Sequence, residues 1–231
     1  MGELDIRRAA LLGALALLAA LLACGDSAPP RRVVSLSEST TRVAQALGLG
    51  DRLQTLDARA PDVLERAFRS GANLALADGS AESADARAAF SSRSAAVRVF
   101  SPTSTEEVFA AYTEIATVLG QPKAAAKLIE QVTREVKASA TGGARPKIAL
   151  VVSRSPLRVV AGDAFLSHLL DLAGIDNVFA GDKAVTELIG AAQLDARKPD
   201  RVLDVSPAML ADAWVDPVAT TRSLQTLASG G

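Results

Sequence analysis

Short apolar segments alternate with stretches of helical periodicity along most of this chain. The apolar runs are bounded by turn-forming or charged residues, which is typical of buried strands. Between them, residues 63–70 and 165–172 carry helical patterns, and Gly174 follows the second where a left-handed helix cap is expected. Alternation of this kind predicts an α/β fold. The predicted strands lie at 33–36, 74–76, 97–100, 148–152 and 202–203.

A helical block lies midway along the chain. It begins at Ser104, which forms a capping-box pattern with Glu107, and apolar residues then recur at spacings of four, three and four up to Leu119. Gly120 and Pro122 interrupt the pattern before a second apolar stripe, which runs to about residue 138. An uninterrupted helix of about 18 residues would span about 27 Å, long enough to join two α/β portions.

The first 23 residues have the pattern of a secretory signal. Arg7 and Arg8 precede an apolar run of 15 residues, 9–23, and small residues lead to Cys24. The run is shorter than the about 18 to 20 residues that cross a bilayer comfortably, which favours a cleaved signal peptide at 1–23. An uncleaved N-terminal membrane anchor is the alternative.

Cys24 is the only cysteine, and it follows Leu21, Leu22 and Ala23. This order resembles the bacterial lipobox, in which the cysteine is acylated on sulfur and becomes the first residue of the mature protein. The resemblance implies that Cys24 is a lipidation site that holds the protein at a membrane surface, with a tether over 24–31. Without a second cysteine, the exported chain has no internal disulfide.

Composition narrows the class of function. Removal of residues 1–23 leaves 208 of the 231 residues, and the 49% hydrophobic content is typical of a folded chain. The 25 basic and 26 acidic residues nearly balance, so nucleic-acid binding is not expected. The sequence carries no motif typical of α/β-hydrolases, P-loop NTPases, dinucleotide-binding enzymes or zinc proteases, and we expect no enzymatic activity.

Three segments resemble the solute-binding lipoproteins of ABC importers that carry cobalamin, haem or iron–siderophore complexes. They are an opening strand and helix at 31–53, a strand, glycine loop and helix at 156–181, and a strand at 196–207. Members of this family have two α/β lobes, each with a central sheet flanked by helices. A long backbone helix joins the lobes, and the ligand lies in the cleft between them.

The resemblance implies both the organisation and the function of this chain. The N-terminal lobe would occupy 32–103, the linking backbone helix 104–140 and the C-terminal lobe 141–231. The protein would capture a corrinoid, haem or ferric siderophore outside the cytoplasm and deliver it to an ABC permease and its ATPase. It would act as a monomer without a cofactor of its own. The alternative is a degenerate family member that serves as an interaction lipoprotein without transport.

The chain departs from the family pattern where the permease would dock. Each lobe of the family commonly presents a glutamate to an arginine pocket of the permease. Glu65 keeps this position in the first lobe, but Ala192 occupies it in the second, where Glu187 could substitute only through a rearranged loop. Arg42 also replaces a glutamate of the first helix. These departures motivate the alternative of a degenerate member.

A further departure concerns the end of the second lobe. The family adds a final strand and helix beyond the region of Trp214, and nothing after this residue has the pattern of a strand. Either the sequence is truncated or the second lobe is smaller than usual.

Two helix starts are the candidate ligand-binding positions. Gly162 allows a close backbone approach, and Asp163 precedes a helix whose amides could bind a polar ligand; a plain strand-to-helix turn is equally expected. The family fold places Ser37, Glu38 and Ser39 at the same cleft, although a serine here also serves as an N-cap.

Two ring side chains complete the candidates. Trp214 is the natural residue to stack on a ligand, with a half-buried core tryptophan as the alternative. His168 is the only histidine. One imidazole cannot supply the ligand set of a receptor for bare zinc or manganese, so we expect an intact complex as ligand and no metal site. A half-buried or surface position on its helix is expected for His168, with haem ligation as a less favoured alternative. The scarcity of aromatic residues weakens the case for a cobalamin or haem ligand.

Overall fold

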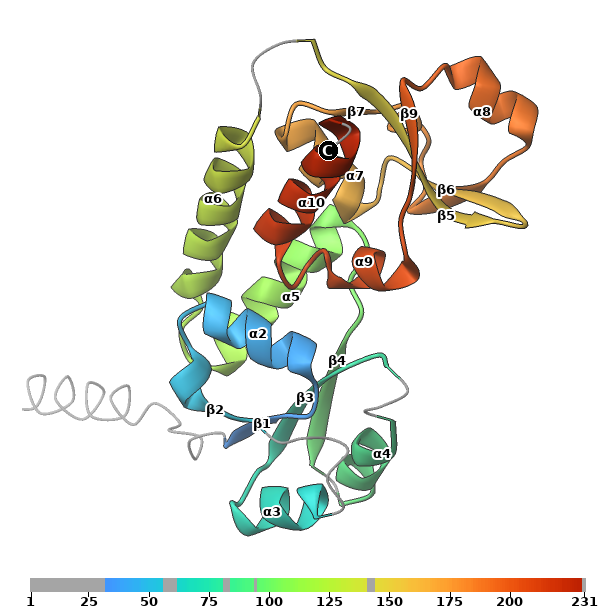
Figure 1. The fold of residues 1–231 in the computed structure, drawn as a ribbon. Helices are drawn as coiled ribbons and strands as arrows, with labels where there is room; N and C mark the ends of the chain where they lie inside the picture. Colours follow the sequence, from blue (N-terminus) through green and yellow to red (C-terminus); the bar gives the residue numbers. More distant parts are fainter. Residues whose placement is uncertain (1–31, 56–61, 81–83, 94, 141–143, 230–231) are drawn as a thin grey trace, which may run out of the picture. The chain divides into compact units, whose positions relative to one another are not determined.

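The computed structural model describes residues 32–55, 62–80, 84–93, 95–140 and 144–229 (Figure 1). Contacts divide the chain into Met1–Arg31 and one compact unit, Arg32–Gly231. The predicted signal peptide, Cys24 and the tether lie outside the described residues. No helix within the described ranges is long and apolar enough to cross a membrane.

Lobe one, Val33–Phe100, is built on a parallel sheet with the strand order β2-β1-β3-β4. Val33 of the central strand faces Leu53 on one side and Leu74 on the other. The central strands are buried along their length, as is usual for parallel strands covered by helices on both faces. The elements of lobe one are β1 (Val33–Ser35), α2 (Glu38–Ala46), η1 (Gly50–Arg52), β2 (Leu53–Thr55), α3 (Val63–Arg69), β3 (Leu74–Asp78), α4 (Ala84–Ser92) and β4 (Ala96–Phe100).

The expected backbone helix at 104–140 is two helices, α5 (Thr105–Val118) and α6 (Lys123–Ala138). The capping box at Ser104 and Glu107 is present at the start of α5. Gly120 has a φ of 77°, which an L-residue rarely adopts, and this ends the first helix. Figure 1 shows α5 running between α7 of lobe two and α2 of lobe one, with α6 beside it.

Lobe two, Lys147–Ser229, has a mixed sheet around the long strand β5. This strand pairs with β7 and β9 in parallel and with β6 in an antiparallel hairpin, and β8 extends the hairpin. The elements of lobe two are β5 (Lys147–Arg154), β6 (Leu157–Val160), α7 (Phe165–Leu172), β7 (Asp176–Asn177), β8 (Thr186–Leu188), α8 (Ala191–Arg197), β9 (Arg201–Asp204), α9 (Pro207–Asp212) and α10 (Pro217–Ser229).

The end of lobe two differs from the expectation in one element. A helix, α10, follows Trp214 and buries Thr221, Leu224 and Ala228. Among the described residues no strand lies between Trp214 and this helix, and β9 pairs only with β5. Val202 of β9 is accordingly 37% exposed.

One hydrophobic cluster runs through both lobes. It includes Val33 and Leu76 of the first sheet, Ile115 of α5, and Leu150 and Trp214 in lobe two. Within this cluster, the Tyr112 hydroxyl of α5 donates a hydrogen bond to the Trp214 carbonyl oxygen. Burial, reinforced by the charge of Asp216, raises the pKa of Tyr112 far above its usual value. The linking helices are therefore part of the core.

Candidate functional site

A large cavity, with a volume of about 1000 Å³, lies in lobe two beside the start of α5. Its walls come from the first residues of α5, from α7 and from the loops around β7 and before β8. The charged or titratable side chains in these walls are Glu106, Arg145, Asp163, His168, Asp171, Asp176 and Lys183.

Buried amide and hydroxyl groups fix the wall at α7 and β7. The Asn177 side-chain amide donates to the Val160 carbonyl oxygen at 3.0 Å and to the Ser167 hydroxyl at 3.1 Å. Its oxygen accepts from the Phe179 amide at 3.1 Å. Because both amide hydrogens and the amide oxygen of this side chain are engaged, Asn177 links β6, α7 and the loop after β7.

One arginine of the cavity wall is paired with two aspartates. Arg145 donates to Asp176 at 2.6 Å and to Asp171 at 2.7 Å. These bonds raise the pKa of Arg145, with the Asp176 bond as the larger cause. Lys183 also lines the cavity, and unlike Arg145 it forms no ion pair with any of the described residues.

His168 is half-buried in the cavity wall, as expected from its position on the helix. Its ring stacks at 6.3 Å from Phe165 and meets Phe109 edge-on at the same distance. Burial lowers the pKa of His168, Asp171 opposes this effect and Lys137 adds to it. The imidazole is therefore biased toward its neutral form, which can accept a hydrogen bond at one nitrogen.

The structure gives Gly162 a packing role. A Cβ atom at this position would lie 2.9 Å from the Asp182 carbonyl oxygen and closer still to that of Ala180. The amides of Gly162 and Asp163 donate to the carbonyl oxygens of Asp182 and Ala184, each at 2.9 Å. Both residues line the cavity, with the Asp163 side chain exposed. The loop is thus a turn anchored on its neighbour, and it also borders the candidate site.

The predicted residues of lobe one lie elsewhere. Ser37 is the N-cap of α2, where its hydroxyl accepts from the Thr40 amide. Ser39 donates to Asp78 at 3.1 Å, which ties the start of α2 to the end of β3. Neither these residues nor Glu38 line the large cavity. The two predicted groups therefore do not both line this cavity.

Trp214 lies in the core, 4% exposed, with its ring centroid 6.5 Å from that of Tyr112. The indole presents almost no surface to a ligand because it packs in the cluster shared by both lobes. Its place matches the alternative of a core tryptophan, and we leave it out of the proposed ligand contacts.

The fold is similar to that of periplasmic binding proteins of known structure. A possible iron-binding (periplasmic solute-binding) protein from Staphylococcus epidermidis matches with a TM-score of 0.59 and 16% identity, over 84% of this chain and 88% of its own. The periplasmic haem-binding protein HutB of Vibrio cholerae matches with a TM-score of 0.55 and 17% identity, over 82% and 83%. The periplasmic haem-binding protein RhuT from Roseiflexus sp. RS-1 gives 0.53 and 16%, over 86% and 97%.

This chain has the fold of the periplasmic solute-binding proteins. The sequence matches no protein-family model, and a search of curated proteins gave no match. The predicted α/β class, with two sheets flanked by helices, is confirmed.

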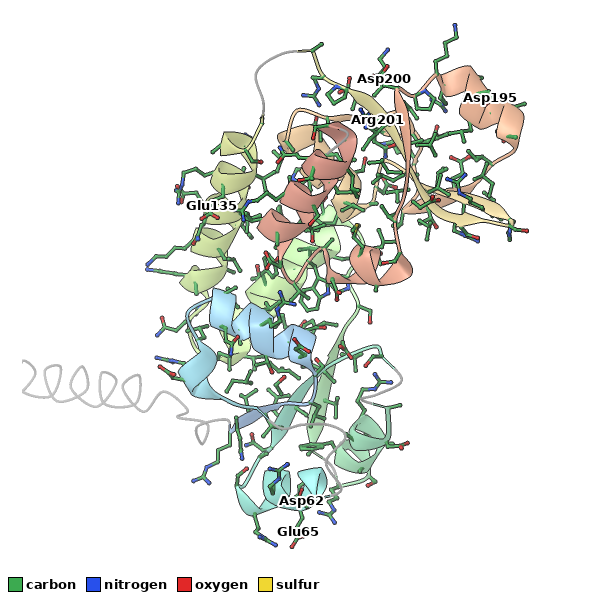
Figure 2. All side chains as sticks on the ribbon, viewed as in Figure 1. Asp62, Glu65, Glu135, Asp195, Asp200 and Arg201 are labelled. Carbon is green, nitrogen blue, oxygen red and sulfur yellow. The ribbon has the colours of Figure 1, made fainter. Side chains whose placement is uncertain are left out.

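The two docking candidates of the solute-binding fold have different surroundings. Glu65 is exposed on α3, where Figure 2 shows it beside Asp62, and it forms an ion pair with Arg69. Glu187 lies in β8, half-buried, and its Oε2 atom is buried without a hydrogen-bond partner. Glu65 is thus accessible to a partner, whereas Glu187 would have to leave its strand position to become so.

Sequence reasoning missed much of the large cavity. Arg145, Asp171, Asp176 and Lys183 belong to no motif, and they meet only because α7 and the loops around β7 fold against each other. One signal was present, since Asp171 follows His168 by one helical turn. Among the described residues, no group of three or more histidine, cysteine or acidic residues is arranged to hold a metal ion.

Proposed function

We propose that this protein is an extracytoplasmic solute-binding lipoprotein that captures a metal–organic complex and delivers it to an ABC permease and its ATPase. The observation that carries the proposal is the fold, two α/β lobes joined through a shared core, which is similar to that of proteins named for haem or iron binding. The ligand would be a corrinoid, haem or a ferric siderophore.

The large cavity of lobe two supports a ligand of this size. Its volume of about 1000 Å³ lies at the upper end of the range of small-molecule sites, roughly 300 to 1000 Å³. Gly162, Asp163 and His168 would contact the ligand from this side. Ser37, Glu38 and Ser39 remain predicted contacts from lobe one, where Ser39 is held in place by Asp78.

Lipidation at Cys24 and docking through Glu65 complete the proposal. The exposure of Glu65 on α3 supports docking, while docking through Glu187 requires a rearrangement of β8.

Glu65→Lys should reduce capture of the permease in detergent. Asp85→Lys, on the exposed face of the neighbouring helix α4, is the matched control and should leave capture unchanged. Equal capture by both variants would remove Glu65 from the docking surface.

The function is tested by retention of coloured ligands on the purified chain from Gly25 onward. After gel filtration, at least one of haem, cyanocobalamin and a ferric siderophore should elute with the protein. Asp163→Lys should weaken that binding at least about ten-fold, since a long cation then occupies the cavity wall. Asp195→Lys, on α8 outside the cavity, should bind normally. Elution of the protein without any of the three ligands would contradict the proposal.

A further inference from the structure

A second cavity, of about 500 Å³, lies where the end of α2 meets the start of α6. Three of its lining side chains are cations, Arg52 from η1 and Lys123 and Lys127 from α6, and no lining residue is acidic. We call this the basic cavity. Figure 1 shows the two helix ends side by side, close to β2.

Nothing in the described part of the chain neutralises these three cations. None of them forms an ion pair there, and Asp51, the acidic neighbour of Arg52 in the chain, does not line the cavity. Arg52 is held in place by a hydrogen bond of 3.0 Å to the Leu119 carbonyl oxygen. Its guanidinium is thus a fixed positive group at the cavity wall.

The two lysines occupy positions that are unfavourable for an isolated helix. Lys123 and Lys127 are four residues apart, so their like charges lie on one face of α6. They also lie at the positive end of the helix dipole, and the first turn holds no acidic residue and no side-chain cap. A bound anion would reduce the repulsion between the two lysines, their repulsion from the positive end of the helix dipole and their repulsion from Arg52. Local rules broken together in this way are typical of a binding site.

Part of the lining of the basic cavity is apolar. Leu47, Leu49 and Leu128 line it together with the cations and belong to the core of the protein. Gln121 and Gln131 add neutral hydrogen-bonding groups to the lining. A phosphate ester suits such a site, because its charged oxygens can meet the cations while its carbon skeleton lies against the leucines.

The position of the cavity in the chain indicates where the phosphate comes from. Strand β1 begins at Val33, which pairs with Leu53, the residue directly after Arg52. Neighbouring strands lie about 4.8 Å apart, so Arg32, the first described residue, lies beside Arg52 of the cavity wall. The eight Cα-to-Cα steps from Cys24 to Arg32 span at most about 29 Å when the chain is extended. With Cys24 lipidated, as in the proposed function on which this step rests, the basic cavity is within reach of lipid headgroups.

We propose that the basic cavity binds the phosphate group of an anionic phospholipid headgroup and holds lobe one against the membrane beside its lipid anchor. Each basic residue at an anionic surface strengthens binding roughly five-fold, so removal of two lysines should weaken it about 25-fold. Salt should weaken it as well, because exposed charges are screened.

The test is co-sedimentation of the chain from Gly25 onward with vesicles. This chain lacks Cys24, so the result depends on neither lipidation nor transport ligand, and the whole described core lies in Arg32–Gly231. Vesicles of phosphatidylcholine with a quarter phosphatidylglycerol are compared with pure phosphatidylcholine. A double variant, Lys123→Gln with Lys127→Gln, is compared with a control double variant, Lys137→Gln with Lys147→Gln. The control removes the same charge away from the basic cavity and therefore shows whether net charge alone determines vesicle binding.

We expect the unmodified chain to bind only the anionic vesicles. The Lys123 and Lys127 variant should lose this binding, and the control variant should keep it. We also expect sn-glycerol 3-phosphate to compete. Equal binding by both variants, or no preference for anionic vesicles, would overturn the proposal. Binding of glycerol phosphate without any vesicle binding would overturn the membrane source and leave a site for a soluble phosphate ester.

Discussion

Gly162 illustrates at the residue scale how one position can serve packing and border a site at the same time. The carbonyl oxygens of Ala180 and Asp182 lie so close that the position excludes any side chain. Its φ lies outside the left-handed region, so the requirement for glycine comes from neighbouring backbone and not from its own conformation. The sequence left open a close approach to a ligand and a plain strand-to-helix turn. In the structure the glycine is required because a neighbouring loop packs against it, and it also lines the cavity.

Gly162→Ala should destabilise the protein by about 1 to 3 kcal/mol, because the added methyl group overpacks against backbone that cannot rotate away. Gly181→Ala is the matched control, since a Cβ there meets nothing within 4 Å. Urea unfolding measures both free energies of unfolding. A Gly162→Ala protein as stable as the Gly181→Ala protein would contradict the packing account.

His168 should make stability fall on mild acidification. Its pKa is lowered in the folded state, so below pH about 6.5 the unfolded state binds the proton first and stability is lost as pH falls. Urea unfolding at pH 7 and pH 5 should show a smaller loss for His168→Asn than for the unmodified chain. Equal losses would show that this imidazole is not perturbed by its cavity wall.

Sequence-based predictions agree with the structure where an interaction is local in the chain, and they fail where it joins distant segments. Ser104 and Glu107 form the predicted cap because a capping box needs only residues that are three apart. Trp214 and the contact of Ser39 with Asp78 depend on segments far apart in the chain, and no local pattern encodes such pairs.

At the scale of elements, the strands and helices with strong patterns were predictable. The five apolar runs all form strands, and both helical patterns of the opening analysis form helices at Val63–Arg69 and Phe165–Leu172. The final helix, α10, carries four hydroxyl residues in its interior, and such residues are weak helix formers, so the sequence pattern did not predict it. Packing against α6 and α7 decides its conformation instead.

The linking block also shows the limit of periodicity. The sequence predicted an interruption at Gly120 and Pro122, but periodicity does not show that the turn there folds α6 back along α5. At 14 residues, α5 spans about 21 Å. It still reaches both lobes, because α2 and α7 pack directly on it.

Ser104→Ala should cost about 1 kcal/mol, since the Glu107 amide then loses its acceptor at the start of α5. Hydrogen bonds from the backbone of Thr103 and Ser104 also hold the pKa of Glu107 below its usual value. Thr117→Ala, in the last turn of the same helix and exposed, is the control and should be nearly neutral. Thermal unfolding separates the two, and an equal effect of both changes would contradict the capping role.

At the scale of the whole molecule, the shared core is the feature that a sequence pattern could not reveal. The continuous cluster and the Tyr112–Trp214 hydrogen bond join the lobes through the linking helices. An ion pair of 3.3 Å between Arg42 and Asp216 adds a contact across them. Arg42, a departure from the family pattern, thus has a partner in lobe two, although an exposed pair of this kind contributes only about 0 to 1 kcal/mol.

Attachment to the membrane is predicted to depend on Cys24. In a bacterial host, the unmodified protein should fractionate with membranes and incorporate labelled fatty acid, because acyl chains add about 0.8 kcal/mol per buried methylene. Cys24→Ala should abolish the label. Labelling of the Cys24→Ala protein at the same level would show that the lipid, if any, is attached elsewhere.

Ligand capture is the central claim, and thermal unfolding of the chain from Gly25 onward tests it most directly. A ligand at 100 times its Kd adds about 2.7 kcal/mol, which for a chain of this size raises the Tm by roughly 5 to 10 °C. We predict such a rise with at least one of haem, a corrinoid and a ferric siderophore. An unchanged Tm with all three at saturating concentration would contradict the account.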